Sequence, residues 1–385
     1  MLIISLTAIW FYAKENQNIN KIRFIKKISS KNPPYLKPVI DPILKVKITR
    51  ITDYKRFQNS YPKHRYAKNQ PFNCDSSLIK LQTKWLLDGN TYKIIKIFPK
   101  SIHFTTSIWS HKNPDILYIF RDDGKILQYN VKTDRLKEIF FLKNYDRVTL
   151  GPNEGNMDLN DKYVALACKR DKDLVVEVLD LKSKKAVSKK TFKNRWGENY
   201  HPLGFDWVSI SPSGEYIVIL WNKKVKNRFE SGNVEVFKRD FSKKRVLYNY
   251  GNHGDICFND KGEEMYVQFA GKSSINGYFL KDNQSFSIFK NKEFEIGSGR
   301  FISCRNYKRK GWCYVSSEKN RLIAAISLDG NKKVEYFTNH NGSQANYKKA
   351  VMAVPNPTGE KVLFSSDWGD KNQKVVYEYI AEKIK

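Results

Sequence analysis

The sequence predicts an all-β protein, namely a seven-bladed β-propeller built from four-stranded antiparallel blades. Three observations support this fold class. A polar turn followed by a run of β-branched or aromatic residues recurs roughly every 40 to 50 residues, a period typical of propellers and other repeat folds. Most copies are followed by a second strand and a compact hairpin, as in a propeller blade. No long stretch with a helical period interrupts the copies.

The clearest turns contain glycine and lie at regular intervals. Gly214 and Gly262 are about 48 residues apart, and Gly262 and Gly359 about twice that, with a weaker copy around Gly311 between them. A long β-sandwich or a solenoid is the alternative, but near-constant spacing favours radial repetition. The complete turns and the strands that follow them are Ser211–Gly214 before Glu215–Trp221, Asn259–Gly262 before Glu263–Phe269, and Asn356–Gly359 before Glu360–Ser366.

The repeats divide the chain into three regions. Residues 1–13 are apolar but shorter than the roughly 20 residues needed to span a bilayer, which predicts a signal peptide or a short membrane anchor. Residues 14–44 form a basic linker interrupted by proline, and residues 45–385 form the propeller. We expect the blades near 45–99, 104–145, 148–193, 204–250, 252–291, 297–339 and 345–383.

The charge of the protein indicates which kinds of ligand it binds, and its N-terminus and cysteines indicate where in or outside the cell it is found. The 69 Lys and Arg residues exceed the 39 Asp and Glu residues by 30, so we expect an acidic polysaccharide or a protein as the ligand. No nucleic-acid-binding module is visible, and the apolar N-terminus predicts an exported protein that is periplasmic, tethered to the cell envelope or secreted. The five cysteines are widely spaced, form no Cys-x-x-Cys motif and are expected to be free and buried.

Polar residues collect where the chain enters the innermost strand of each blade, and these positions should meet at one rim of the channel. His253 lies two residues before Asp255, whose carboxylate could fix the tautomer of the imidazole. Arg residues are uncommon beside the many lysines, and a guanidinium can bind a carboxylate through two hydrogen bonds. We therefore predict a catalytic set and a ligand-binding set: His253, Arg300, Arg305, Tyr66 and His64 in the first, and Glu154, Asp206, Asp255 and Gln344 in the second.

Each of these residues also has a structural interpretation. Asp206 and Asp255 could hydrogen-bond a tight turn within a blade, and Glu154 could cap backbone amides. Arg300 and Arg305 could pair with acidic residues of neighbouring blades instead of a ligand. No P-loop, dinucleotide fingerprint, zinc-protease motif or nucleophile elbow occurs in the sequence, and no cofactor is identified.

The turns, and above all the segment Pro355–Gly369, resemble the blades of exported bacterial propellers, including the seven-bladed oligogalacturonate lyases. In those lyases, metal-binding His and Gln residues and a catalytic Arg lie at the channel rim. The resemblance implies such roles for His253, Gln344, and Arg300 or Arg305. No His precedes the turn of the last blade, so we predict no metal site.

Two functions follow from these expectations. The first is a non-catalytic, exported propeller that binds an anionic glycan or a protein at its channel rim. The second is a polysaccharide lyase that cleaves a uronate-containing chain by β-elimination, with His253 as the base, the two Arg residues as a carboxylate clamp, and Tyr66 or His64 as the proton donor. A hydrolase would instead need two carboxyl groups from among Glu154, Asp206 and Asp255.

Overall fold

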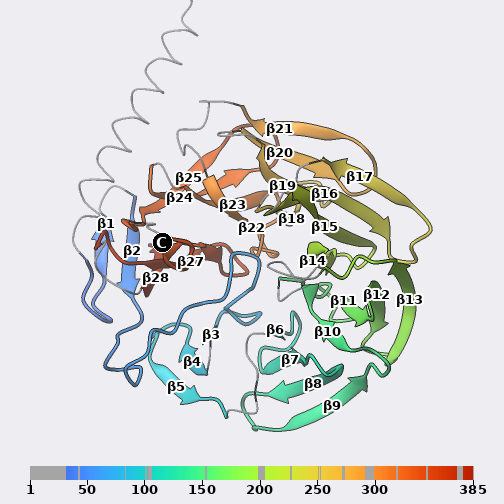
Figure 1. The fold of residues 1–385 in the computed structure, drawn as a ribbon. Coiled ribbons are helices and arrows are strands. Elements are labelled where there is room, and N and C mark those ends of the chain that lie inside the picture. Colours follow the sequence, from blue (N-terminus) through green and yellow to red (C-terminus); the bar gives the residue numbers. More distant parts are fainter. Residues whose placement is uncertain are drawn as a thin grey trace, which may run out of the picture.

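Seven β-sheets are arranged as blades around a central axis, which confirms the predicted seven-bladed propeller (Figure 1). The computed structural model describes residues 32–41, 44–82, 84–99, 102, 106–151, 154–197, 204–225, 228–249, 251, 253–270, 274–290, 299–317, 320–343, 346–370 and 376–384, with backbone only for 224–225, 228–230 and 299–300. The predicted signal segment 1–13 and most of the predicted linker lie outside these residues. No helix among the described residues is long and apolar enough to cross a membrane.

Five blades have four antiparallel strands in sequence order. Blades two and three comprise β6 (Ser107–Trp109), β7 (Ile116–Phe120), β8 (Lys125–Asn130), β9 (Leu136–Phe141), β10 (Arg147–Thr149), β11 (Tyr163–Arg170), β12 (Asp173–Asp180) and β13 (Lys185–Phe192). Blades four to six comprise β14 (Phe205–Ile210), β15 (Tyr216–Val225), β16 (Arg228–Lys238), β17 (Lys244–Tyr248), β18 (Asp255–Phe258), β19 (Glu264–Ala270), β20 (Ser274–Phe279), β21 (Ser285–Phe289), β22 (Gly299–Ser303), β23 (Trp312–Ser317), β24 (Leu322–Ser327) and β25 (Val334–Asn339).

The predicted turns have a common geometry. Gly214, Gly262 and Gly359 have φ of +79°, +79° and +74°, a region that glycine enters without the steric cost of a Cβ. In each turn the glycine amide donates to the carbonyl three residues earlier, as from Gly359 to Asn356 (2.9 Å). The Asn356 side chain also accepts from the amide of Lys361 at 3.0 Å, which connects the turn to the strand that follows.

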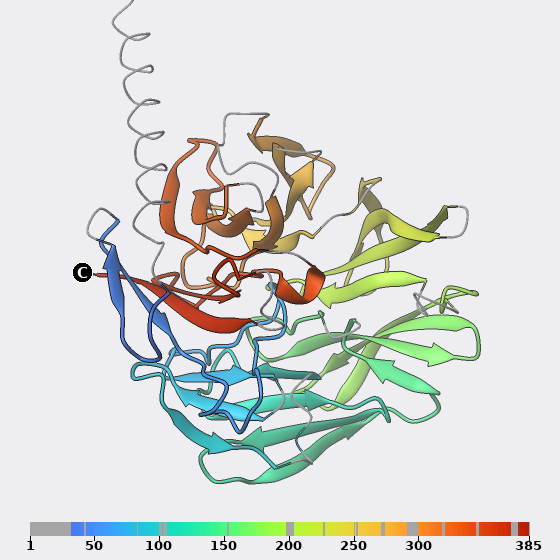
Figure 2. The ribbon, with the colours of Figure 1, turned by 60° about the vertical axis from the view of Figure 1, so that its left-hand side comes forward.

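The two ends of the propeller chain close the ring within one blade. β26 (Val354–Pro355), β27 (Lys361–Ser366) and β28 (Tyr377–Lys383) are joined by β2 (Val46–Arg50), which pairs antiparallel with β28, and by β1 (Val39–Asp41) at the edge. Figure 2 shows the N-terminal strands beside the C-terminal one. The prediction that residues 45–50 belong to blade one and residues 39–41 to the linker is therefore wrong, because both segments are strands of the closing blade. The alternating apolar pattern of β2 does not reveal which sheet it joins, and its partner lies at the other end of the chain.

Among the described residues, blade one consequently has three strands, β3 (Leu78–Leu81), β4 (Trp85–Asp88) and β5 (Ile94–Ile97). The segment of residues 64–72, which contains a turn at residues 67–69, takes the place of its innermost strand and forms a β-bridge to β3 between Phe72 and Ile79. Figure 1 shows the chain after β2 running toward the centre of the ring. The Gln70 side chain donates to the carbonyls of Arg305 (2.9 Å) and Pro355 (3.0 Å), so this segment connects blade one with blades six and seven.

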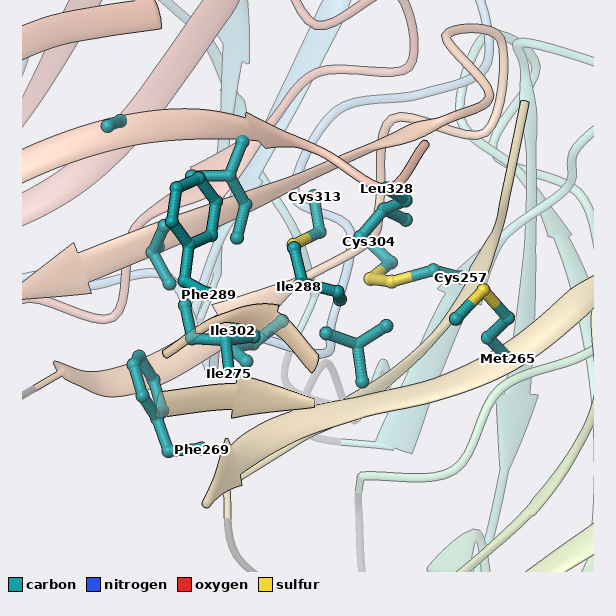
Figure 3. Packing of buried hydrophobic residues seen from close by; sticks show 14 residues of the cluster. Cys257, Met265, Phe269, Ile275, Ile288, Phe289, Ile302, Cys304, Cys313 and Leu328 are labelled. Carbon is teal, nitrogen blue, oxygen red and sulfur yellow. A yellow bond between two sulfur atoms is a disulfide. The ribbon is translucent and has the colours of Figure 1, made fainter. Parts of the chain in front are cut away.

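Apolar side chains fill the space between adjacent blades. Between blades five and six, Met265, Ile288 and Ile302 are fully buried (Figure 3). The same cluster contains a disulfide between Cys257 and Cys304, whose Cα atoms are 5.2 Å apart. The expectation of five free cysteines is therefore wrong for this pair, because residues 47 positions apart in sequence meet across neighbouring inner strands. Cys74, Cys168 and Cys313 are free and buried, as expected.

Candidate functional site

Two of the predicted catalytic residues meet at the face of the ring on which the innermost strands begin, here called the upper face. The hydroxyl of Tyr66 lies 2.8 Å from Nδ1 of His253. Tyr66 comes from the segment that enters the axis, and His253 directly precedes β18 of blade five, so the pair joins residues 187 positions apart. A tyrosine that donates to Nδ1 leaves the imidazole proton on Nε2. Tyr66, rather than the expected Asp255, is therefore the group that can orient His253.

Aromatic rings surround this pair. Phe301 of β22 packs edge-on against Tyr66, with ring centres 5.5 Å apart, and lies 5.0 Å from the His253 ring. Phe301 also contacts the ring of Tyr347, which begins the short helix η3 (Tyr347–Lys349). Tyr66 and Phe301 are buried, whereas Tyr347 is 47% exposed. We call these four residues, Tyr66, His253, Phe301 and Tyr347, the aromatic cluster; Tyr347 presents its ring to solvent.

A buried lysine lies beside the aromatic cluster. The Lys68 ammonium pairs with the Glu154 carboxylate at 2.8 Å and is 4.4 Å from the centre of the Trp207 ring. The Lys68 side chain is 2% exposed and that of Glu154 is 23% exposed, so the ammonium is buried while the carboxylate stays partly accessible. The carbonyl of Lys68 accepts from the side chain of Asn156 in blade three, which holds the segment in the axis.

The electrostatics of this region favour protonated side chains. Burial raises the pKa of Tyr66 well above its usual value, and the nearby charge of Glu154 adds to the effect. Burial also raises the pKa of Glu154; the Lys68 charge opposes this shift and the Asp206 charge reinforces it. The charge of Asp206 also raises the pKa of Tyr66, so both predicted ligand-binding acids act electrostatically on this region. At neutral pH Tyr66 keeps its proton, as a hydrogen-bond donor must.

Arg305 and Asp255 form a buried ion pair between blades six and five. Nη2 of Arg305 lies 2.8 Å from Oδ1 of Asp255, and Nε lies 3.1 Å from Oδ2. Asp255 also accepts from the amides of Ile256 and Cys304, both at 2.8 Å. The adjoining cavity of about 20 Å³ has room for a water molecule and not for a sugar. The geometry thus matches the structural interpretation of both residues, a strut between adjacent blades.

His64 is likewise held inside the protein. Its Nδ1 lies 2.6 Å from the carboxylate of Glu378 on β28, and its Nε2 lies 2.6 Å from the carbonyl of Met352. Both side chains of the His64–Glu378 pair are fully buried. A carbonyl only accepts, so Nε2 donates to Met352, and the ring connects blade one with blade seven. In this position His64 has no access to a ligand on the upper face.

The remaining predicted residues are less fully described. Arg300 lies in β22, for which only the backbone is described at this position, and Gln344 lies outside the described residues. The roles predicted for these two residues therefore stay predictions. Within the described part of the chain, no three His, Cys, Asp or Glu side chains are grouped so that they could hold a metal ion.

Sequence reasoning missed Lys68 and Phe301, and it assigned no role to Tyr347. The available signal was the segment from His64 to Gln70, which lacks the alternating pattern of a strand although it precedes a blade. Such a segment can leave the sheet. The sequence around Phe301 is that of an ordinary strand, and nothing in it shows that Phe301 contacts Tyr66, because that contact depends on how distant blades come together in the ring.

Comparison with known proteins identifies the fold of this chain but no family to which it belongs. No model of a protein family matches the chain, and no curated protein matches its sequence. Solved structures do match. An oligogalacturonate lyase in complex with manganese aligns with a TM-score of 0.63 and 11% identity, covering 90% of this chain and 96% of that one.

Other propellers align over similar lengths. An oligogalacturonate lyase from Vibrio parahaemolyticus gives a TM-score of 0.61 at 11% identity, with 90% and 96% of the two chains covered. The WD40 domain of Neurospora crassa Pan2 gives 0.55 at 10% identity, with 91% and 98% covered. At such low identity these matches establish the β-propeller fold and its architectural resemblance to the oligogalacturonate lyases. They assign no reaction, because one fold supports many functions.

Proposed function

We propose that this protein is an exported propeller that binds an anionic glycan at its upper face, over the aromatic cluster. The observation that carries the proposal is the Tyr66–His253 hydrogen bond beside the exposed ring of Tyr347. An exposed aromatic ring offers an apolar face to a sugar, and the neighbouring hydroxyl and imidazole groups supply hydrogen bonds. The net charge of +30 would attract a polyanionic chain to the protein.

Two features support export. The apolar segment 1–13 has the length of a signal-peptide core. Disulfides persist in oxidising compartments outside the cytoplasm, and Cys257 and Cys304 form one. An acidic polysaccharide of the cell surface or of the surroundings would then be within reach. Fractionation of the source cells tests this step: we expect the mature protein outside the cytoplasm, and free cytosolic protein with an intact Met1 would contradict it.

A lyase acting on uronate chains is the second candidate, and the Tyr66–His253 pair is the observation that favours it. In β-elimination a base removes the proton next to the uronate carboxylate, the bond to the leaving glycosidic oxygen breaks, and that oxygen receives a proton. For His253 to act as the base, its neutral ring would carry the proton on Nδ1 and donate it to the Tyr66 oxygen, the reverse of the hydrogen-bond direction described above. Nε2 could then accept the first proton, and the Tyr66 hydroxyl would supply the proton that the leaving oxygen receives. A cation, for which Arg300 is the candidate, would neutralise the carboxylate.

One experiment distinguishes the two candidates. The protein is incubated with polygalacturonate while the ultraviolet absorbance of an unsaturated product is followed, and binding is measured in parallel. Binding without product supports the glycan-binding function, whereas product formation that is lost in His253→Ala supports the lyase. Absence of both binding and product with polygalacturonate, alginate and glycosaminoglycans would contradict the proposal.

A further inference from the structure

A groove lies between blades three and four, away from the aromatic cluster. Its volume is about 670 Å³, within the range typical of sites for small organic ligands. The groove is formed where the end of β13 approaches β15 and β16, and Figure 1 shows these two blades side by side. Its lining includes Lys193, Arg195, Trp221, Lys223, Glu235 and Lys244.

Packing fixes the position of Arg195 at this groove. The next residue, Trp196, is buried against Phe205, with ring centres 5.7 Å apart, and its amide donates to the carbonyl of Lys172. The carbonyl oxygen of Arg195 lies so close to Gly204 that a Cβ on residue 204 would be only 2.1 Å from it. The chain at Arg195 is therefore held from both sides, which limits the freedom of its side chain.

The Arg195 guanidinium stacks on the Trp221 ring, 4.2 Å from its centre. Phe192 packs against the same indole, and the indole Nε1 donates to the buried carboxylate of Glu235 at 2.7 Å. Arg195 forms no ion pair with a carboxylate among the described side chains. Stacking uses the face of the guanidinium and leaves its N–H groups, which lie in the plane, available to a ligand.

The other charges of the groove largely offset one another. Lys244 pairs with Glu235 at 2.7 Å, and Lys193 pairs with Asp173 at 2.9 Å. The half-buried Arg195 and the exposed Lys223 leave an excess of positive charge in the groove. Burial lowers the pKa of Arg195, and the charge of Glu235 only partly opposes this shift. A bound anion would relieve this desolvation cost.

We infer that this groove binds a sugar-sized organic anion through a carboxylate or phosphate group. Arg195 provides the planar pair of donors that such groups prefer, Trp221 holds the guanidinium in place, and Lys223 adds a second positive charge. The inference does not depend on the aromatic cluster, because the two sites share no residue. It assigns a second, small-molecule site to a protein whose upper face is proposed to bind a polymer.

Calorimetric titration of the full chain tests the inference with three probes. Digalacturonate carries carboxylates, glucose 6-phosphate carries a phosphate, and cellobiose is a neutral disaccharide. We expect at least one anion to bind and cellobiose not to bind, and the tighter anion identifies the group recognised. Arg195→Gln should weaken binding of that anion by roughly tenfold to a hundredfold, as expected for loss of a charge-assisted pair of hydrogen bonds.

Matched variants separate this site from other causes. Arg135→Gln removes an exposed arginine in the turn between β8 and β9 and should leave binding unchanged. Tyr347→Ala alters the upper face and should leave anion binding in the groove intact, so failure of the glycan-binding proposal is measured separately. If Arg195→Gln does not fold, Lys223→Gln, at an exposed position, serves instead and should weaken binding by about threefold or more. The inference would be overturned if the wild type and the groove variant bound the anion equally well, or if cellobiose bound as tightly as both anions. It would also be overturned if neither anion bound at 10 mM, which is roughly the weakest affinity that a specific anion site would show.

Discussion

Individual side chains at the channel divide into those that hold the ring together and those that can meet a ligand. Asp255, Arg305 and His64 are buried and satisfied by neighbouring blades. Tyr66, His253 and Tyr347 instead form a layer that reaches solvent on the upper face. The same residue types occur in structural pairs and in the proposed ligand site, and the burial of each side chain determines which of these two roles it has. Their substitution should therefore have opposite effects on stability and on binding.

Arg305→Ala should destabilise the protein and leave glycan binding by the folded fraction unchanged. It removes one partner of a buried ion pair and leaves the Asp255 carboxylate without its guanidinium, which typically costs about 3–5 kcal/mol. The free energy of unfolding is measured by denaturant titration, and binding is measured below the transition. A normal stability with lost binding would restore Arg305 to the ligand site.

Tyr347→Ala should have the reverse effect. The ring is half exposed, so its loss should change stability little, but it removes the apolar surface proposed to contact the sugar. Binding of polygalacturonate should weaken by about tenfold, equivalent to roughly 1.4 kcal/mol. Tyr54→Ala, which removes another exposed tyrosine, is the control. Equal effects of the two variants would argue against a site at the aromatic cluster.

His340 should make the protein less stable as the pH falls. It is fully buried, its Nε2 lies 2.8 Å from the carbonyl of Ser317, and its Nδ1 accepts from the amide of Gly342 at 3.0 Å. Protonation of Nδ1 breaks the second bond, and burial lowers the pKa from its usual 6.5 to about 4. The unfolded chain binds this proton more readily, so the free energy of unfolding should decrease by up to about 3 kcal/mol between pH 6.5 and pH 4.

The measurement compares the wild type with His340→Gln across this pH range. The variant is expected to start from lower stability and to lose less on acidification, because the buried imidazole is absent. The carboxylates titrate in both proteins, so their contribution to the pH dependence of the free energy of unfolding cancels in the comparison. Parallel curves for the two proteins would contradict the assignment.

At the scale of strands, the links between distant parts of the chain determine whether the ring closes. β2 completes the blade of β26, β27 and β28, so the N-terminal and C-terminal strands hold each other in register. The disulfide joins the inner strands of blades five and six next to the Asp255–Arg305 pair. Both links cross between elements that would separate if the ring opened.

Loss of the disulfide should lower stability measurably. A link that spans 47 residues reduces the entropy of the unfolded chain by an amount worth about 4 kcal/mol in a simple loop-closure treatment. Cys257→Ala with Cys304→Ala should therefore lower the free energy of unfolding by about 2–4 kcal/mol. Cys168→Ala, which removes a free cysteine, controls for lost packing. Mass spectrometry without reduction that shows five free thiols would contradict the link.

At the scale of the whole molecule, the closed ring predicts a single cooperative unit. Removal of residues 345–385 deletes three strands of the closing blade and exposes the sheets beside it, so we expect no cooperative thermal transition. Removal of residues 1–31 should leave a cooperatively folding propeller, since β1 and β2 are retained. Calorimetry or circular dichroism of the two truncated chains measures this. A soluble, cooperative protein without residues 345–385 would contradict closure.

The amino-acid sequence alone was sufficient to predict the propeller, its seven repeats and the turns at Gly214, Gly262 and Gly359, because these features depend on local periodicity and on backbone conformations that glycine favours. It also led to the expectation that Tyr66 and His253 lie at one rim, since equivalent positions of each blade meet at one face, and these two side chains are in contact. Only the tertiary structure determined that β2 closes the last blade, that residues 64–72 fill the axis, and that Arg305 pairs with Asp255. The physical reason is that ring closure and buried pairing join residues far apart in sequence, and no local pattern records which partner a strand or a charge will meet.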